Sequence, residues 1–128
     1  MTFYPMAGNP ALNLQATTGE AGFALQDATP VILSWTAPND GNLHRTTVAS
    51  IISISAAITG GQIRVEAYPP DGAGLASSTI YTGTNGPFSA FATFTPVFTI
   101  GPGTTVQVVQ TSAVTAGAAT LWAEIWGS

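Results

Sequence analysis

Cysteine and lysine are absent from this chain of 128 residues, and other basic side chains are rare. Without cysteine the chain has no disulfide framework, no thiolate metal site and no thiol nucleophile. The strong cations are Arg45 and Arg64 alone, within a net charge of −4. Because binding to nucleic acid needs many cations to displace phosphate counterions, we expect no nucleic-acid partner.

Charge of either sign is scarce. Charged residues make up 6% of the chain, against about 25% in ordinary soluble proteins, and hydrophobic residues make up 45%. A folded monomer of this size exposes roughly 6,000 Å² of surface, which so few charges protect poorly against association. We therefore expect a subunit that is covered by copies of itself or by a larger body. The alternative is a monomer that Thr, Ser, Gln and Asn keep soluble.

Targeting signals and long hydrophobic runs are also missing. The first ten residues, MTFYPMAGNP, lack the basic and apolar regions of a secretory signal, and the chain has no Asn-x-Ser/Thr acceptor. The longest apolar stretch, residues 48–58, is interrupted by serines and is too short to span a bilayer as a helix. We expect no signal peptide and no membrane contact.

Helical periodicity is absent, and strand periodicity takes its place. Glycine and proline recur roughly every 8 to 15 residues, and between them apolar and polar residues alternate with period two. This pattern predicts an all-β fold, a single-domain antiparallel β-sandwich over residues 11–128 that follows an extended arm of residues 1–10. The expected strands are residues 12–17, 23–25, 31–36, 51–68 as a hairpin, 75–81, 88–100, 105–111 and 120–126.

The expected hairpin turns at Gly60-Gly61, because glycine supplies the positive φ values that a two-residue turn demands. Pairing of Thr59 with Gln62 would place three apolar pairs on one side of the ladder and polar residues on the other. The inward pairs would be Ile58 with Ile63, Ala56 with Val65 and Ile54 with Ala67. The outward pairs would be Ala57 with Arg64, Ser55 with Glu66 and Ser53 with Tyr68.

Residues 88–100 contain Pro96, which cannot donate a ladder hydrogen bond. The segment is therefore expected to be an edge strand or two strands broken by a bulge. One parity is expected to line the core, which leaves Phe91 and Val97 outside. The residues of that parity are Phe88, Ala90, Ala92, Phe94, Phe98 and Ile100.

Two segments are candidates for an interface. The first ten residues carry Phe3, Tyr4 and Met6, too apolar for a free tail and too rich in proline for a sheet interior, and are expected to lie on a neighbour. Near the carboxyl end, Trp122, Glu124 and Trp126 share one strand face, and Leu121, Ala123 and Ile125 share the other. If the aliphatic face is core, the indoles point outward, as at a subunit interface or a sugar-stacking platform. The alternative is that the indoles form the core.

The residues that could carry chemistry fit structural roles better. His44 has no cysteine or acidic cluster near it in sequence to complete a metal shell or a relay, so it is read as a strand or loop residue. Asp40-Gly41 and Asp71-Gly72 fit turns better than calcium loops, and nothing shows that Glu66 and Asp71 converge as a glycosidase pair. We expect no catalytic residue, no metal site, no cofactor and no enzymatic activity.

Three segments, QIRVEAYPPDGAG (62–74), FTPVFTIGPGTTVQVVQTSA (94–113) and AATLWAEIWGS (118–128), resemble small jelly-roll-like modules of bacteriophage virions. Capsid decoration proteins and head- or tail-fibre domains belong to this group. The resemblance implies a trimer without catalytic residues, located in the virion after assembly in the host cytoplasm and attached to a major capsid or other virion protein. It transfers no site residue, because these modules share architecture more than sites.

These observations favour a non-catalytic structural subunit of a virus particle, in the manner of a capsid decoration or accessory protein that binds the capsid surface and self-associates. Its interface is expected to include Phe91 besides the arm and the tryptophan face. The alternative is a carbohydrate-binding or receptor-binding module of the fibre-tip type, in which Trp122, Trp126 or Tyr81 stacks on sugar rings.

Overall fold

The structure, a computed structural model, describes residues 11–25, 31–70, 76–82, 88–94 and 97–128, and within these residues 54–61, 76–82, 88–94 and 112–116 by their backbone alone. The described residues form strands and turns, and they contain no helix that could cross a membrane. The strands are β1 (Asn13–Thr17), β2 (Phe23–Ala24), β3 (Val31–Thr36), β4 (His44–Tyr68), β5 (Ala76–Thr82), β6 (Phe88–Phe94), β7 (Phe98–Ile100) and β8 (Thr105–Gly127).

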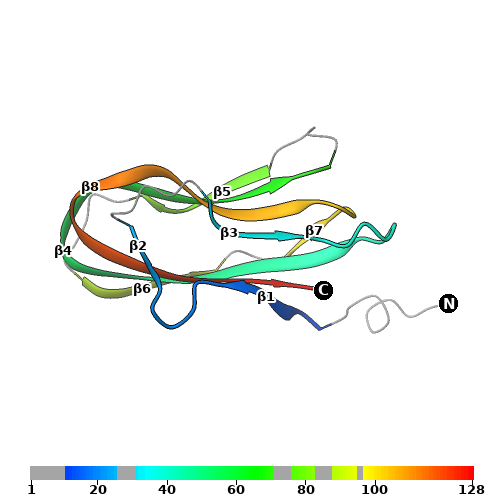
Figure 1. Cartoon of the computed structure of the whole chain (residues 1–128), viewed down its shortest axis with the longest axis horizontal. Helices are drawn as coiled ribbons and strands as arrows, with labels where there is room; N and C mark the ends of the chain where they lie inside the picture. Colours follow the sequence, from blue (N-terminus) through cyan, green and yellow to red (C-terminus); the bar gives the residue numbers. More distant parts are fainter. Residues whose placement is uncertain (1–10, 26–30, 71–75, 83–87, 95–96) are drawn as a thin grey trace.

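Two long strands, β4 of 25 residues and β8 of 23 residues, form the centre of the fold. They pair antiparallel along their whole length, from Thr46 opposite Gly127 to Tyr68 opposite Thr105. The register shifts several times between Ile54 and Ile63 of β4, and Figure 1 shows the pair turning back on itself there. Since bulges bend a strand and increase its twist, these shifts let one ribbon fold over into two layers.

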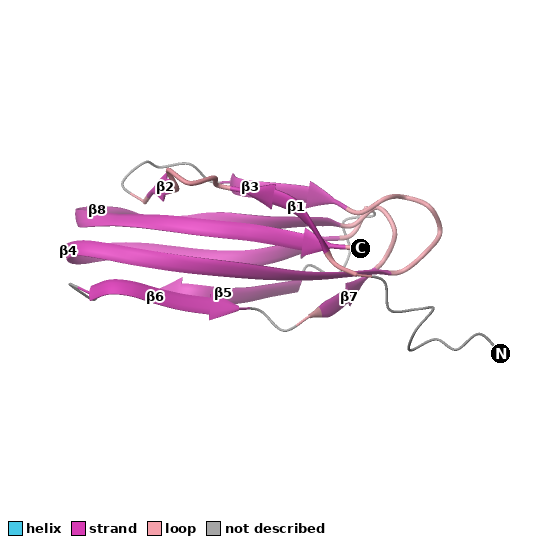
Figure 2. Ribbon diagram, turned by 90° about the horizontal axis from the view of Figure 1, so that it is seen from below, coloured by secondary structure: helices cyan, strands magenta, loops and turns pink. Residues whose placement is uncertain are grey.

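Each layer is a sheet built on one half of this ribbon. Figure 1 shows the two layers, and Figure 2 shows β8 and β4 side by side at their centre. The first sheet contains β1 and β2, the second half of β8, the first half of β4, and β6 with β7. The second sheet contains β3, the first half of β8, the second half of β4, and β5. Each list follows the order of neighbouring strands across its sheet, and together they are the topology of a jelly roll. The expected antiparallel β-sandwich of jelly-roll type is confirmed.

The core lies between the two sheets and consists of one parity of each strand. Val48 and Ile52 of β4 alternate with exposed or half-buried neighbours, as the period of two requires. From the other sheet, Val65 and Val108 pack toward them. The largest fully buried side chains in the described part of the chain are Leu25, Ile52, Ile63, Leu121 and Ile125.

One contact between the sheets depends on the absence of a side chain. Trp35 of β3 projects across the sandwich onto Gly127 of β8, where an added Cβ atom would lie 2.4 Å from the indole ring. Such a separation is far inside van der Waals contact, so only glycine lets the ring approach the opposite sheet this closely.

The expected hairpin at Gly60-Gly61 is wrong. Thr59 lies opposite Ala116 and Gly60 opposite Val114, so both halves of the segment pair with β8 and not with each other. The two expected strands 105–111 and 120–126 are correspondingly one strand. The long ribbon prevails because it gives hydrogen-bond partners to the whole of β4, whereas a local hairpin would leave the centre of both sheets unpaired.

The predicted parity of residues 62–68 is confirmed, since Ile63, Val65 and Ala67 are buried. Glu66 lies on the outer face as expected but is only 9% exposed. Residues 88–100 do form two strands, β6 and β7, and Val97 lies outside at 45% exposure. In β6, Phe91 is opposite Ile52 and Phe94 is opposite Ala49; their side chains are outside the described residues.

We predict that Gly127→Ala destabilises the fold by about 1–3 kcal/mol, because the added methyl group overpacks the contact with the Trp35 ring. Gly101→Ala is the matched control. Its added Cβ would meet nothing closer than Thr104 Oγ1 at 3.9 Å, so its free energy of unfolding should stay within about 0.5 kcal/mol of the parent. Urea unfolding of both variants measures the difference, and equal stability of the two would contradict the contact.

Candidate interaction surface

The outer face of the first sheet carries the tryptophans near the carboxyl end. Leu121, Ala123 and Ile125 are buried at 0–1% exposure, so the aliphatic side of β8 is core and the alternate residues lie outside. This settles which face of the strand points outward. Trp122, Glu124 and Trp126 are each half-buried on the outer face.

Strands β4 and β1 extend this face on both sides of β8. Ile51 lies opposite Trp122, and Thr47 lies opposite Trp126. Across the other edge of β8, Leu14 lies opposite Trp126. Ile51 and Leu14 are each 45% exposed. Large apolar side chains from three neighbouring strands therefore lie next to one another without a covering element from the described part of the chain. We call this surface the tryptophan face; it consists of Leu14, Thr47, Ala49, Ile51, Trp122, Glu124 and Trp126.

A shallow groove of about 440 Å³ opens at one end of the tryptophan face. The floor is formed by β4 and β8, and one wall is formed by the end of β1 and the turn that follows it. Two acidic residues, Glu20 and Glu124, are among those that line it, and no arginine is. The residues that line it are Thr17, Thr18, Gly19, Glu20, Ala49, Ser50, Ile51, Trp122, Ala123 and Glu124.

The wall of the groove is fixed by hydrogen bonds to β8. Trp122 Nε1 donates to the main-chain oxygen of Glu20 at 2.8 Å, and Thr18 Oγ1 accepts from Ala123 N at 3.1 Å. Gly19 and Gly22 have φ values of +76° and +72°, and a Cβ on Gly22 would lie 2.8 Å from Trp122 Nε1. Both the left-handed backbone and the close approach require glycine here. The Trp122 ring is thereby anchored at its nitrogen edge.

The outer face of the second sheet differs in character. Arg64, Glu66 and Tyr68 follow one another along its β4 half, with Ser34, Thr36, Thr105 and Gln107 on neighbouring strands. Tyr68 donates its hydroxyl proton to the Glu66 carboxylate, and this bond raises the pKa of Tyr68. Arg64 Nε lies 4.0 Å from the same carboxylate. One outer face thus carries an internally bonded polar network, and the other carries indoles and aliphatic side chains.

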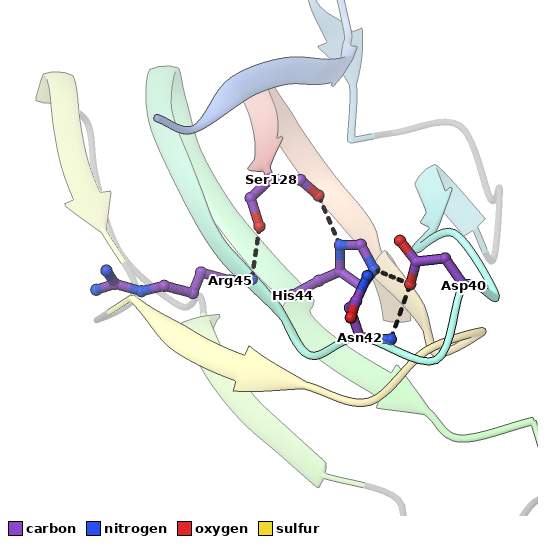
Figure 3. Close-up of polar contacts among 5 residues, drawn as sticks. All are labelled: Asp40, Asn42, His44, Arg45 and Ser128. Carbon is purple, nitrogen blue, oxygen red and sulfur yellow. Dashed lines mark hydrogen bonds and ion pairs between the residues drawn. The ribbon is translucent and has the colours of Figure 1, made fainter. Parts of the chain in front are cut away.

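A third group of polar residues binds the end of β8 to the turn before β4 (Figure 3). His44 is 7% exposed; its Nε2 lies 2.9 Å from Asp40 Oδ1 and its Nδ1 lies 2.8 Å from the main-chain oxygen of Ser128. Asp40 Oδ1 also accepts from Asn42 N at 3.0 Å, which is the turn chemistry expected for this segment. We call the three residues Asp40, His44 and Ser128 the histidine clasp.

The histidine clasp contains the residue types of a serine-hydrolase triad in a different arrangement. In a triad the imidazole is hydrogen-bonded to the serine hydroxyl. Here it contacts the main-chain oxygen of Ser128, while Ser128 Oγ accepts from Arg45 N at 3.0 Å. The contacts join β4, β8 and the turn, and they support the structural reading of His44. Among the described residues, no group of three or more His, Cys, Asp or Glu side chains could hold a metal ion.

Of the residues predicted for the interface, the structure brings together Trp122, Glu124 and Trp126, with Trp126 Nε1 donating to Glu124 Oε1 at 3.2 Å. Phe3, Tyr4 and Met6 lie outside the described residues, and Phe91 is described by its backbone alone. The sequence analysis missed Leu14, Ile51 and the Glu20 wall of the groove. The spacing of Gly19 and Gly22 beside Glu20 was the available signal for that wall.

We predict that the free energy of unfolding falls as pH rises through the folded-state pKa of His44. Both ring nitrogens face oxygens that only accept, so the imidazolium can donate to both and the neutral ring to one. The hydrogen bond to Asp40 accordingly raises the pKa of His44 above its ordinary value of about 6.5. This stabilisation is complete below pH of about 6.5 and is lost above the raised value.

Urea unfolding at a series of pH values from about 5.5 to about 9 measures this dependence of the free energy of unfolding. His44 is the only histidine of the chain, so His44→Gln should abolish the step. Asp40→Asn keeps an oxygen for Asn42 N but removes the charge, and should shift the step to lower pH. A step that persists unchanged in His44→Gln would rule out this origin.

No protein-family model matches the chain, and no curated protein matches it in sequence. The jelly-roll framework itself carries viral capsid proteins, lectins and cupins, so the fold alone leaves the activity open. The function must therefore be inferred from the surfaces of the molecule, and the tryptophan face exposes large apolar side chains from three neighbouring strands.

Proposed function

We propose that this protein is a non-catalytic structural subunit that assembles with copies of itself through the tryptophan face. One observation carries the proposal, namely the difference between the two outer faces of the sandwich. The outer face of the first sheet carries Trp122, Trp126 and Ile51. The outer face of the second carries the polar network of Arg64, Glu66 and Tyr68. A monomer would gain nothing from such a difference, and burying the apolar side against another copy removes it from water.

The composition of the face agrees with that of an interface centre. Tryptophan is enriched at such centres because it buries a large area at a small cost in conformational entropy, and its indole N–H can be satisfied locally. Both indole nitrogens already have partners within the chain, Glu20 O and Glu124 Oε1. Docking would therefore bury the rings without leaving either indole N–H unpaired.

We further propose that the assembly belongs to a virus particle and acts as a capsid decoration or accessory protein. Support comes from the scarcity of charge, with 6% of residues charged, and from the resemblance to phage virion modules. The jelly roll is a common framework for capsid proteins. In this proposal residues 1–10, with Phe3, Tyr4 and Met6, bind a neighbouring subunit or the major capsid protein.

Ile51→Glu is expected to weaken self-association at least about tenfold, because it places a charge opposite Trp122 within the proposed contact. Val31→Glu is the matched control: Val31 is 42% exposed against 45% for Ile51, but it belongs to β3 of the other sheet. Sedimentation velocity over a concentration series measures association, and circular dichroism checks the fold. A parent protein that stays monomeric throughout, or equal effects of both changes, would refute the proposal.

The groove favours a second candidate, a carbohydrate-binding or receptor-binding module. An indole beside two carboxylates and two threonine hydroxyls offers a stacking surface together with acceptors for sugar hydroxyls. Tyr81, named as a third stacking residue, is described by its backbone alone. In this candidate the aromatic ring of Trp122 holds the ligand, and the assembly serves to multiply weak sites.

The two candidates predict different partners for the assembled protein. The structural role predicts that purified particles contain this chain in fixed proportion to a major capsid protein, as measured by quantitative mass spectrometry, and that a glycan array gives no signal. The binding role predicts array signals that Trp122→Ala abolishes while circular dichroism stays unchanged. Signals that survive Trp122→Ala would exclude the groove as the sugar site.

A further inference from the structure

A positive charge lies beside one end of the tryptophan face, and the acidic groove opens at the other end. Arg45 lies on the outer side of β4 beside Ser128, four residues before Ala49. Ala49 is opposite Glu124, which borders the groove together with Glu20. Four residues of extended strand span about 13 Å, so the cation and the acidic groove are well separated on one molecule. They form no ion pair within the described part of the chain.

Arg45 is the cation that this face has available. Its guanidinium extends away from the histidine clasp (Figure 3), and no ion pair joins it to a carboxylate in the described part of the chain. The other arginine, Arg64, lies on the opposite outer face near Glu66. Lysine is absent from the sequence. A second copy of this chain can therefore offer the groove only one cation from this surface.

From this complementarity we propose that Arg45 of one copy inserts into the groove of a second copy that faces it. There it would lie between Glu20 and Glu124 and against the ring of Trp122. The inference rests on the proposed self-association and adds its orientation. Two copies that place their tryptophan faces together with antiparallel strands, centred on the row of Thr47 and Trp126, bring Arg45 of each over the Ala49–Glu124 row of the other. Facing sheets lie about 10 Å apart, a gap that the arginine side chain and the groove share.

The chemistry of the groove suits a guanidinium. Carboxylates accept its N–H groups, and an indole face attracts a cation through its quadrupole. Without this pair, the apolar part of the face would allow the copies to slide or to pack with parallel strands. In the packing with parallel strands, Arg45 of one copy would face Arg45 of the other and Glu124 would face Glu124, which is unfavourable. Arg45 would thus set which of two apolar packings forms.

Charge exchange tests the pair. Arg45→Glu and Glu124→Arg should each weaken self-association about tenfold or more, and the double variant Arg45→Glu/Glu124→Arg should recover most of the loss. Glu124→Gln keeps the acceptor of Trp126 Nε1 and should still weaken association, which separates the charge from the local hydrogen bond. Arg45→Gln should also weaken association, whereas its matched control, Arg64→Gln, should leave association unchanged. Sedimentation velocity measures the constants, and circular dichroism confirms the fold of every variant.

The outcomes distinguish a failure of the arginine contact from a failure of the proposed self-association. If the parent protein self-associates and Ile51→Glu abolishes the association, but the Arg45 and Glu124 variants associate like the parent, only the arginine contact is wrong. If the double variant is as weak as the two single losses combined, the two residues do not pair and the contact is equally overturned. A parent protein that remains monomeric overturns both proposals.

Discussion

The antiparallel pairing of β4 with β8 is the interaction on which the rest of the structure depends. This ribbon provides the two central strands of both sheets, and every other strand is hydrogen-bonded to one of its two members. Its fold at residues 54–63 of β4 brings the inner faces of its two halves together, so that Val48 and Ile52 meet Val65 and Val108. The position of every surface residue follows from this bend, including those of the tryptophan face.

The bend also explains why the two outer faces can differ so much. A strand that changes sheets keeps its alternation, and the register shifts between Ile54 and Ile63 adjust which parity faces the core. In the first half of β4 the outward residues are Arg45, Thr47, Ala49 and Ile51; in the second half they are Arg64, Glu66 and Tyr68. One strand can therefore supply an apolar surface to one side of the molecule and a bonded polar surface to the other. The proposed assembly uses this division.

The sequence was sufficient to predict the fold class, because alternation of apolar and polar residues is a local property that survives in the structure. It predicted the bounds of β3 correctly and placed Ile63, Val65 and Ala67 in the core. It also showed that Trp122 and Trp126 share one side of a strand. It could not choose a partner for residues 51–68. The same period of two fits a local hairpin or a distant strand, and the pair of glycines fits a turn or a bend.

The candidate surface was less accessible to sequence reasoning for a similar reason. Leu14 and Ile51 are 37 positions apart in sequence and belong to one surface only because β1 and β4 lie on either side of β8. The histidine clasp is a related case, since His44 meets Ser128 across 84 positions. Neighbours of this kind are created by topology, and residue type alone gives no sign of them.

The shared ribbon has a consequence for synthesis on the ribosome. β8 is made after all seven other strands, yet β1, β2 and β3 have no other partner strand in the described residues. Until residues 105–127 have emerged from the ribosome, each sheet lacks one of its two central strands. The nascent chain then carries several unpaired strand edges rich in apolar residues. Folding must then wait for the last strand and proceed through distant contacts, which favours a slow reaction and a need for shielding during translation.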